Sequence, residues 1–405
     1  MSLILFGIDR VLATPGSVPG SVGLVTNEAA RTALDPLVPA RMALQRAGVD
    51  LVRLFSPEHG LGADAADGVP VADGFDPLTG LPVTSLYGAS LRPPQETLGD
   101  LGAVLFDLPD VGTRFYTYIW TLSHVMEACA EADVPLVVLD RPNPLGGEMA
   151  AAEGPVLDVE AFGSFVGRAA IPIRHSVSMG ELALLWKAEW KLDLELRILS
   201  CQGWRRSMHW PDTGLAFVPP SPAMPSYESA LLYPGLCLME ATNLSAGRGT
   251  NRPFQLVGAP WLAAEETVRA FNALALPGIR AESSSFTPAQ EPHAGVQCRG
   301  IFLRVTDPRV LRPVEAGLHL LAAVIRTHGG KFRWVPYPTA ANPSGEGHFE
   351  RLAGRVGIRE ALEESPDDLK DRMAAWTSPC GWQDRVEELL LYGEEESVAF
   401  THPVG

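Results

Sequence analysis

Apolar and polar positions follow a repeating pattern over roughly the first 150 residues. Nearly continuous apolar runs that break into polar residues occupy 21–27, 49–60, 101–112 and 134–144. Segments with helical spacing of apolar residues lie between them, at 37–48 and 118–133. Unbroken apolar runs separated by helices are typical of βαβ units with a buried parallel sheet. The pattern therefore predicts a Rossmann-like sheet.

The pattern changes after Gly154. Helical spacing, strand-like runs and a proline-rich loop follow one another irregularly, at 179–190, 192–201, 217–229, 300–307 and 314–328. Such a mixture is typical of an α+β domain. We therefore expect an α/β protein of two domains: a Rossmann-like domain over 1–155 that carries the catalytic motifs, and an α+β domain over 156–405 that closes the cleft.

Polar side chains stand at the predicted carboxyl ends of all four strands. In parallel α/β sheets, ligands bind at this edge. The side chains are Asn27, Ser56, Glu58, His59, Asp107, Asp110, Asp140, Arg141 and Asn143. Some of them could cap the following helices instead. As a set, they predict a functional site at this edge of the sheet.

The composition narrows the possible partners. A net charge of -16 opposes binding to a phosphate backbone, so nucleic acid is not an expected partner. No apolar run approaches the roughly 20 residues of a membrane span. Five scattered cysteines without CxxC spacing argue against a disulfide framework and a zinc knuckle. Because no signal-peptide pattern is present, we expect a cytoplasmic protein.

Common cofactor motifs are missing from the sequence. It has no Walker-type phosphate loop, no GxSxG elbow and no HExxH. Gly16 and Gly20 precede the first predicted strand and Gly23 lies near its start, whereas a dinucleotide fingerprint follows the strand. We therefore expect neither a cofactor nor a bound metal, and the sequence does not fix the oligomeric state.

Two motifs combine carboxylates with aromatic residues. FSPEHGLG at 55–62 holds Glu58 and His59 on a sharp turn, where a carboxyl group is well placed for proton transfer. DLPDVGTRFYTYIW at 107–120 joins Asp110 and Arg114 to an aromatic cluster, as sugar sites often do. The alternatives are a solvated glutamate with a loop-capping histidine, and an internal salt bridge beside core aromatics.

Three further segments supply polar candidates. Glu153 is the natural second carboxylate for Glu58, because glycosidases use two. The segments LDRPNPLGG, PIRH and YPGLCLMEATNLSAGRGT add Asp140, Arg141, Asn143, Arg174, His175, Glu240, Asn243, Arg248 and Thr250. Ser178 and Glu181 match a capping box, which suffices to explain that pair.

These motifs occur in the same order in one bacterial family. SPEHG, DxxDVGxRxYTY, LDRPNPLGG with EGP, PIRH before GEL, PPSPxMP and YPGxCLxExTNLSxGRGT span nearly the whole chain. In these motifs the chain resembles the NamZ-type exo-β-N-acetylmuramidases of peptidoglycan recycling. The resemblance implies a site between a Rossmann-like and a smaller α/β domain. It also implies release of terminal N-acetylmuramic acid from peptidoglycan fragments.

The resemblance places family residues on this sequence. The family's glutamates, histidine, arginine and tyrosines fall on Glu58, His59, Arg114, Tyr116, Tyr118 and Glu153. Departures occur at Ala246, where a carboxylate is usual, at Ala241, where glycine is usual, and at Glu28, where histidine is usual. The usual PIRHGMT also reads PIRHSVS here. If a missing group is catalytic, specificity or activity is altered.

The motifs support a mechanistic hypothesis. Glu58 acts as general acid, and Glu153 or Asp110 activates water or stabilises oxocarbenium-like charge. Arg114 or Arg248 pairs with the lactyl carboxylate of muramic acid.

Two other classes of protein stay open at this point. One is a metal-dependent hydrolase that uses His59, Asp107, Asp110 and His175. The other is a non-catalytic muropeptide-binding protein.

Overall fold

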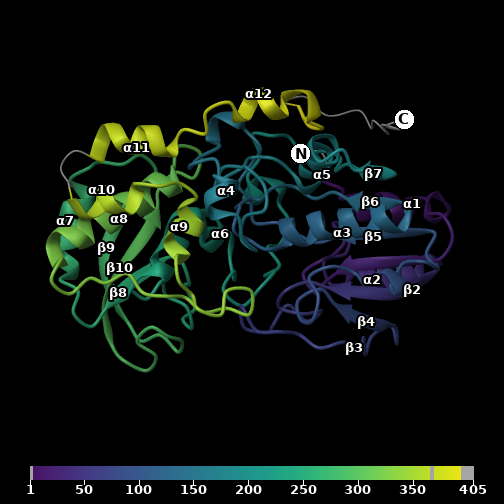
Figure 1. Cartoon of the computed structure of the whole chain (residues 1–405), viewed down its shortest axis with the longest axis horizontal. Helices are drawn as coiled ribbons and strands as arrows, with labels where there is room; N and C mark the ends of the chain where they lie inside the picture. The colour runs from purple at the N-terminus through teal and green to yellow at the C-terminus, as the bar shows by residue number, and fades with distance from the viewer. Residues whose placement is uncertain (1–2, 365–368, 394–405) are drawn as a thin grey trace.

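The computed structural model describes residues 3–364 and 369–393. Figure 1 shows two lobes side by side: a parallel sheet with its helices, and a smaller lobe built from the second half of the chain. No helix in the described ranges is long and apolar enough to cross a membrane. The α/β fold class with a second, α+β domain is confirmed.

The first lobe is built on a seven-stranded sheet in the order β3-β4-β2-β1-β5-β6-β7. Its strands are β1 (Val22–Thr26), β2 (Leu51–Ser56), β3 (Gly74–Phe75), β4 (Pro82–Ser85), β5 (Ala103–Asp107), β6 (Leu136–Leu139) and β7 (Leu196–Leu199). All neighbours pair in parallel except β3, which is an antiparallel edge strand. The strand order reverses between β1 and β5, so the carboxyl ends of these two strands form the switch point where ligands bind in such folds.

Alternating side chains of each strand serve two separate cores. Val104 and Phe106 of β5 pack with α3 (Tyr118–Ala132) and α5 (Met179–Glu189). Ala103 and Leu105 belong to the opposite face, with α1 (Gly7–Ala13) and α2 (Ala40–Arg46). Because both faces are covered, the strands are largely apolar, which is why they could be found in the sequence.

The predicted elements of this lobe are confirmed within a few residues. The strand patterns correspond to β1, β2, β5, β6 and β7, and the helical patterns to α2, α3 and α5. The Ser178–Glu181 capping box is also confirmed. The sequence pattern did not indicate β3, β4 or α1; β3 and β4 lie at the edge of the sheet and are partly exposed, so they lack a continuous apolar run. The sheet continues to Leu199, beyond the boundary at residue 155 expected from the sequence.

The second lobe contains an antiparallel sheet in the order β8-β10-β9. It comprises β8 (Leu256–Ala259), β9 (Ile279–Phe286) and β10 (Cys298–Val305), with α6 (Tyr227–Leu236), α7 (Ala264–Asn272) and α8 (Pro313–His328) packed nearby. The smaller helices are α4 (Val159–Phe162), α9 (His348–Ala353), α10 (Ile358–Glu364), α11 (Leu369–Thr377) and α12 (Trp382–Val386). The chain then returns to the first lobe (Figure 1), where the Tyr392 hydroxyl donates to Asp140 Oδ2 at 2.6 Å.

Glu153 joins the two lobes through the start of α8. Its carboxylate accepts the backbone N–H groups of Val314 (3.2 Å) and Glu315 (2.7 Å). These are N–H groups that a helix leaves without an internal partner. The side chain is fully buried, and burial raises its pKa to about 7, although Arg312 and the two N–H groups oppose this shift.

The raised pKa of Glu153 predicts a pH-dependent contribution to stability. Folded Glu153 holds its proton more tightly than the unfolded chain does, so its contribution to the free energy of unfolding falls as pH rises from about 4.5 to about 7. The variant Glu153→Gln lacks this component. Over that interval we expect the wild type to lose at most roughly 3 kcal/mol of its free energy of unfolding relative to the variant.

Urea unfolding at a series of pH values measures this difference. Glu315→Gln is the matched control, because Glu315 is partly exposed on the same helix turn. A difference between Glu153→Gln and wild type that stays constant with pH would contradict the prediction.

Candidate active site

A pocket lies where the carboxyl end of β2 and the start of α3 meet the second lobe. Its wall combines carboxylates, one arginine, two histidines and many aromatic rings. The lining residues include Glu58, His59, Asp67, Gly68, Tyr87, Phe115, Tyr116, Thr117, Phe165, Tyr233, Glu240, Arg248, Tyr337 and His348. The pocket therefore unites motifs that lie nearly 300 residues apart in the sequence.

Glu58 is held in one orientation at the floor of this pocket. The Gly68 N–H donates to Oε1 at 2.8 Å, and the Thr117 hydroxyl contacts Oε2 at 2.7 Å. A hydroxyl can donate to a carboxylate or accept from a carboxylic acid, so this geometry suits both protonation states. Glu58 is only 6% exposed, yet it lines the pocket and is available to a bound ligand.

The turn after β2 explains how Glu58 reaches the pocket. Pro57 ends the strand, and His59 and Gly60 both take left-handed backbone angles, with φ of 69° and 73°. The strained histidine is fixed by its Nδ1 contact with the Ala65 carbonyl at 2.8 Å. Tyr118 supports the turn from behind, because its hydroxyl lies 3.4 Å from the Glu58 carbonyl oxygen.

Arg248 comes from the second lobe and binds carboxylates of both lobes. Its Nε donates to Glu240 Oε1 at 2.5 Å, and its Nη1 donates to Asp67 Oδ1 at 3.1 Å. The Tyr337 hydroxyl donates to the other Asp67 oxygen at 2.5 Å, and the Tyr337 ring stacks on His348. This network fixes the second lobe against the loop that carries Gly68.

The electrostatics of the pocket follow from its burial. Burial alone would raise the pKa of Glu240, but Arg248 and His348 outweigh it and lower the pKa to about 2. Glu240 is therefore ionised throughout the physiological range. Burial and the nearby Glu58 carboxylate raise the pKa of Tyr87 well above its ordinary value, so its hydroxyl stays a hydrogen-bond donor.

Two residues expected at the site are held elsewhere by backbone groups. Glu153 caps α8 and is absent from the described lining of the pocket. Arg114 is fully buried and donates to the carbonyl oxygens of Pro155 (2.9 Å), Ile171 (3.2 Å) and Leu352. Burial lowers the pKa of Arg114 to about 9. In this position it fixes loops of both lobes.

Other predicted residues also have contacts within the scaffold. Asp140 accepts from Ser178 Oγ and the Gly180 N–H at the start of α5, and burial raises its pKa to about 6. The remaining contacts to backbone carbonyls are Asn143 to Val177, Arg174 to Leu145, Asn243 to Lys331 and Thr250 to Gly247. These side chains shape loops around the pocket rather than its described wall. Of the other candidates, His59, Tyr116, Glu240 and Arg248 line the pocket, whereas Tyr118 supports it.

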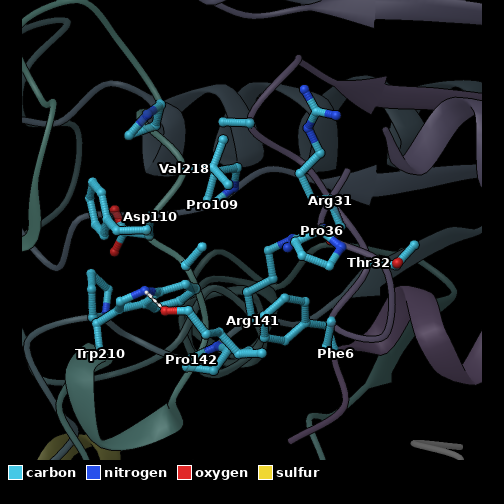
Figure 2. A pocket seen from close by; sticks show the side chains of 17 residues that line it. Phe6, Arg31, Thr32, Pro36, Pro109, Asp110, Arg141, Pro142, Trp210 and Val218 are labelled. Carbon is cyan, nitrogen blue, oxygen red and sulfur yellow. Dashed lines mark hydrogen bonds between the residues drawn. The ribbon is translucent and has the colours of Figure 1, made fainter. Parts of the chain in front are cut away.

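Asp110 and Arg141 lie at a second hollow, which Figure 2 shows from close by. It lies beyond the carboxyl ends of β1, β5 and β6, and Arg31 and Trp210 stand on opposite sides of it. Arg141 lines this hollow and forms a buried ion pair with Asp107, at 2.6 Å between Nε and Oδ1. Asp110 lies 3.1 Å from the imidazole Nε2 of His175, measured from Oδ2.

The four residues of the metal-hydrolase alternative are therefore distributed over separate places. His59 lines the Glu58 pocket, Asp107 pairs with Arg141, and Asp110 pairs with His175. Within residues 3–364 and 369–393, no group of three or more His, Cys, Asp or Glu side chains is arranged to hold a metal ion. The geometry does not favour that alternative.

The departures from the family pattern lie outside the described pocket wall. Ala241 and Ala246 are buried but are not among the lining residues. Glu28 forms ion pairs with Arg31 and Arg41, the latter at 2.6 Å. In the described structure these substitutions therefore leave the contacts of Glu58 and Arg248 in place.

Several residues of the pocket were not predicted from the sequence, among them Asp67, Thr117, Tyr337 and His348. Asp67 and Tyr337 lie in loops, and only the fold brings them together. Thr117 was the one that could have been found, because it belongs to the RFYTY motif and directly precedes a predicted helix.

The fold and pocket define an α/β protein whose polar, aromatic-lined site lies between a Rossmann-like domain and a smaller domain. Residues 22–228 match the family model for the N-terminal part of exo-β-N-acetylmuramidase NamZ, and residues 231–392 match the model for its C-terminal part. The chain belongs to this family.

A curated relative and two solved structures agree with this assignment. The peptidoglycan β-N-acetylmuramidase NamZ of Bacillus subtilis is 41% identical over 343 residues, which cover 84% of this chain and 80% of the relative. Two DUF1343 family proteins of Bacteroides fragilis have similar structures. The first has a TM-score of 0.83 at 29% identity, covering 96% of this chain and 99% of its own. The second has a TM-score of 0.73 at 26% identity, covering 97% and 100%.

The contacts of Arg114 predict a role in stability. The variant Arg114→Met removes the donors of three buried carbonyl oxygens, and each buried group left without a partner costs about 1–3 kcal/mol. We expect the free energy of unfolding to fall by about 2 kcal/mol or more, while the folded protein keeps its ligand affinity. Chemical unfolding and ligand titration measure the two effects.

Arg168→Met is the matched control, because Arg168 is partly exposed and bonds the partly exposed Glu127 as well as the buried Ser123 hydroxyl. Unchanged stability combined with lost ligand binding in Arg114→Met would assign Arg114 to the substrate instead.

Proposed function

We propose that this protein is an exo-β-N-acetylmuramidase, a glycosidase that releases terminal N-acetylmuramic acid from peptidoglycan fragments during cell-wall recycling. The observation that carries the proposal is the pocket itself, which presents the Glu58 carboxyl group and the Arg248 guanidinium from opposite lobes. Family membership and the 41% identical muramidase support it.

Glu58 is the proposed general acid. It would protonate the glycosidic oxygen as the bond from that oxygen to the anomeric carbon breaks, and water would then supply the hydroxyl group at that carbon. The Gly68 and Thr117 contacts prevent the carboxyl group from rotating away from the substrate. Fixed orientation of a proton donor is worth a large part of its catalytic effect.

A second carboxylate would stabilise the positive charge that develops on the sugar ring. Asp67 and Glu240 line the pocket, and Glu240 is held ionised by Arg248 and His348. The contacts of Glu153 favour a structural role, and Asp110 lines the neighbouring hollow. For this charge-stabilising role we therefore favour a carboxylate of the pocket wall over Glu153 and Asp110, the two residues expected from the sequence.

Arg248 is the proposed partner of the lactyl carboxylate, the group that distinguishes muramic acid from glucosamine. Arg114, the other candidate, is committed to three backbone carbonyls. Arg248 lines the pocket, where its Nε binds the buried Glu240 and its Nη1 binds the partly exposed Asp67. The rings of Phe115, Tyr116 and Tyr233 offer apolar surface for the sugar.

The proposed substrate is a small muropeptide fragment, and the proposed location is the cytoplasm. All five cysteines are free, as is usual in proteins of a reducing compartment. An imported fragment would fit an exo-acting enzyme with a pocket rather than an open groove.

Hydrolysis of paired chromogenic substrates tests the proposed activity. We expect cleavage of a β-N-acetylmuramide, little cleavage of the matching N-acetylglucosaminide, and no effect of EDTA. Glu58→Gln removes the transferable proton and should lose roughly 100-fold or more of kcat, with unchanged thermal unfolding. Muramide cleavage at the wild-type rate by Glu58→Gln would remove Glu58 from the mechanism. Binding of muropeptide without turnover by the wild type would favour the sensor alternative.

Arg248→Lys tests recognition of the lactyl carboxylate. Lysine keeps the charge but lacks the planar fork. The variant should therefore lose about 2 kcal/mol or more of apparent binding energy for the muramide, which appears as a lower kcat/KM. Arg252→Lys is the matched control, because Arg252 lies on the same loop, is exposed and packs on Phe302. Equal kinetics for Arg248→Lys and wild type would separate Arg248 from substrate recognition.

A further inference from the structure

The two carboxylates that bind Arg248 differ in depth and in strength of contact. Glu240 is 6% exposed in its side chain and lies 2.5 Å from Nε. Asp67 is 28% exposed in its side chain and lies 3.1 Å from Nη1. Removing Glu240 from the arginine would leave a buried charge without a partner, which is costly. Releasing Asp67 would return a partly exposed carboxylate to water, which costs little.

The charge around Arg248 limits how a further anion can bind. Three carboxylates, those of Glu58, Asp67 and Glu240, line the pocket beside this single guanidinium. A ligand carboxylate that joined Asp67 and Glu240 would place three anions on one cation, and they would repel one another at short range. Exchange of one protein carboxylate for the ligand carboxylate keeps the local charge unchanged.

We propose that Asp67 occupies the place of the substrate's carboxylate, so that an anionic sugar binds by displacing Asp67 from Arg248. This inference rests on the proposed function, and it makes Asp67 a determinant of specificity. Tyr337 provides an anchor during the exchange, because its hydroxyl bonds Asp67 Oδ2 while Oδ1 is released. A neutral sugar has no group to exchange and leaves the Asp67–Arg248 pair closed.

The exchange occurs one residue away from the contact that orients Glu58. Gly68 donates its N–H to Glu58 Oε1 at 2.8 Å and accepts the Ala340 N–H at 3.0 Å. Gly68 has a φ of 70°, and a Cβ placed there would lie 3.0 Å from Thr339 Cβ, so this segment fits closely against the second lobe. Recognition of the ligand's carboxylate and orientation of the proton donor thus share one loop.

Binding titrations of two free sugars test the exchange. N-acetylmuramic acid carries the lactyl carboxylate and N-acetylglucosamine does not, and both are titrated calorimetrically into wild type, Asp67→Asn and Asp64→Asn. Asparagine at 67 still accepts from Tyr337 but no longer competes as an anion. We expect Asp67→Asn to bind N-acetylmuramic acid roughly two- to fivefold more tightly than wild type, the range that a partly exposed ion pair supports, with unchanged affinity for N-acetylglucosamine.

Asp64→Asn is the matched control, because it removes an equal charge from an exposed site on the same loop, outside the described pocket wall. Weaker binding of N-acetylmuramic acid by Asp67→Asn would make Asp67 a direct ligand of the sugar and overturn the exchange. An equal gain in affinity in both variants would show that only general charge repulsion was relieved, and would also overturn the exchange. If wild type neither prefers N-acetylmuramic acid nor cleaves the muramide, the proposed function is contradicted, and the exchange, which rests on it, is contradicted with it. A wild type that cleaves the muramide while Asp67→Asn shows no gain refutes the exchange alone.

Discussion

The ion pair between Arg248 and Glu240 is the interaction on which the pocket depends. Glu240 is buried and carries its charge at all physiological pH values, because Arg248 and His348 lower its pKa to about 2. Breaking such a pair costs several kcal/mol, since the remaining charge has lost its access to water. Arg248 also reaches Asp67 on the first lobe, so the same guanidinium that neutralises Glu240 sets the distance between the lobes at the pocket. The position of Glu58 follows from it, because Gly68 is the neighbour of Asp67 and holds the Glu58 carboxyl group.

The fold could be predicted from the sequence wherever burial was complete. Strands such as β5 and β6 are covered on both faces, so every residue before the terminal Asp107 of β5 is apolar, and the pattern identifies both strands without reference to the rest of the chain. Strands β3 and β4 lie at the edge of the sheet and are short and partly exposed, and they left no such pattern. The extent of the first lobe was also hidden, because β7 joins the sheet only after the chain has crossed α5.

The candidate site could be predicted only in part, because a sequence motif contains residues that line the pocket as well as residues that bond the scaffold. Glu58 and Arg248 were found because their motifs combine charge with a turn. Glu153, Arg114 and Asp140 belong to equally distinctive motifs, yet their polar groups bond backbone atoms at the starts of helices and between loops. A buried charge must have fixed partners whether or not it meets a ligand, so sequence alone does not separate the two uses. Asp67 and Tyr337 carry no motif, and only the packing of the lobes brings them together.

Many of the charged side chains at the sheet edge bond the scaffold and not the pocket. Arg114, Arg174 and the Asp107–Arg141 pair hold loops at the sheet edge with little room to move. At the switch point between β1 and β5, where Rossmann-like folds usually bind ligands, Arg141 pairs with Asp107 and lines the second hollow. The Glu58 pocket lies at the end of β2, where the second lobe supplies part of its wall. A site assembled in this way requires both lobes, because the carboxyl group on one lobe and the guanidinium on the other become a single binding surface only when the loop at Asp67 and Gly68 is bonded to both.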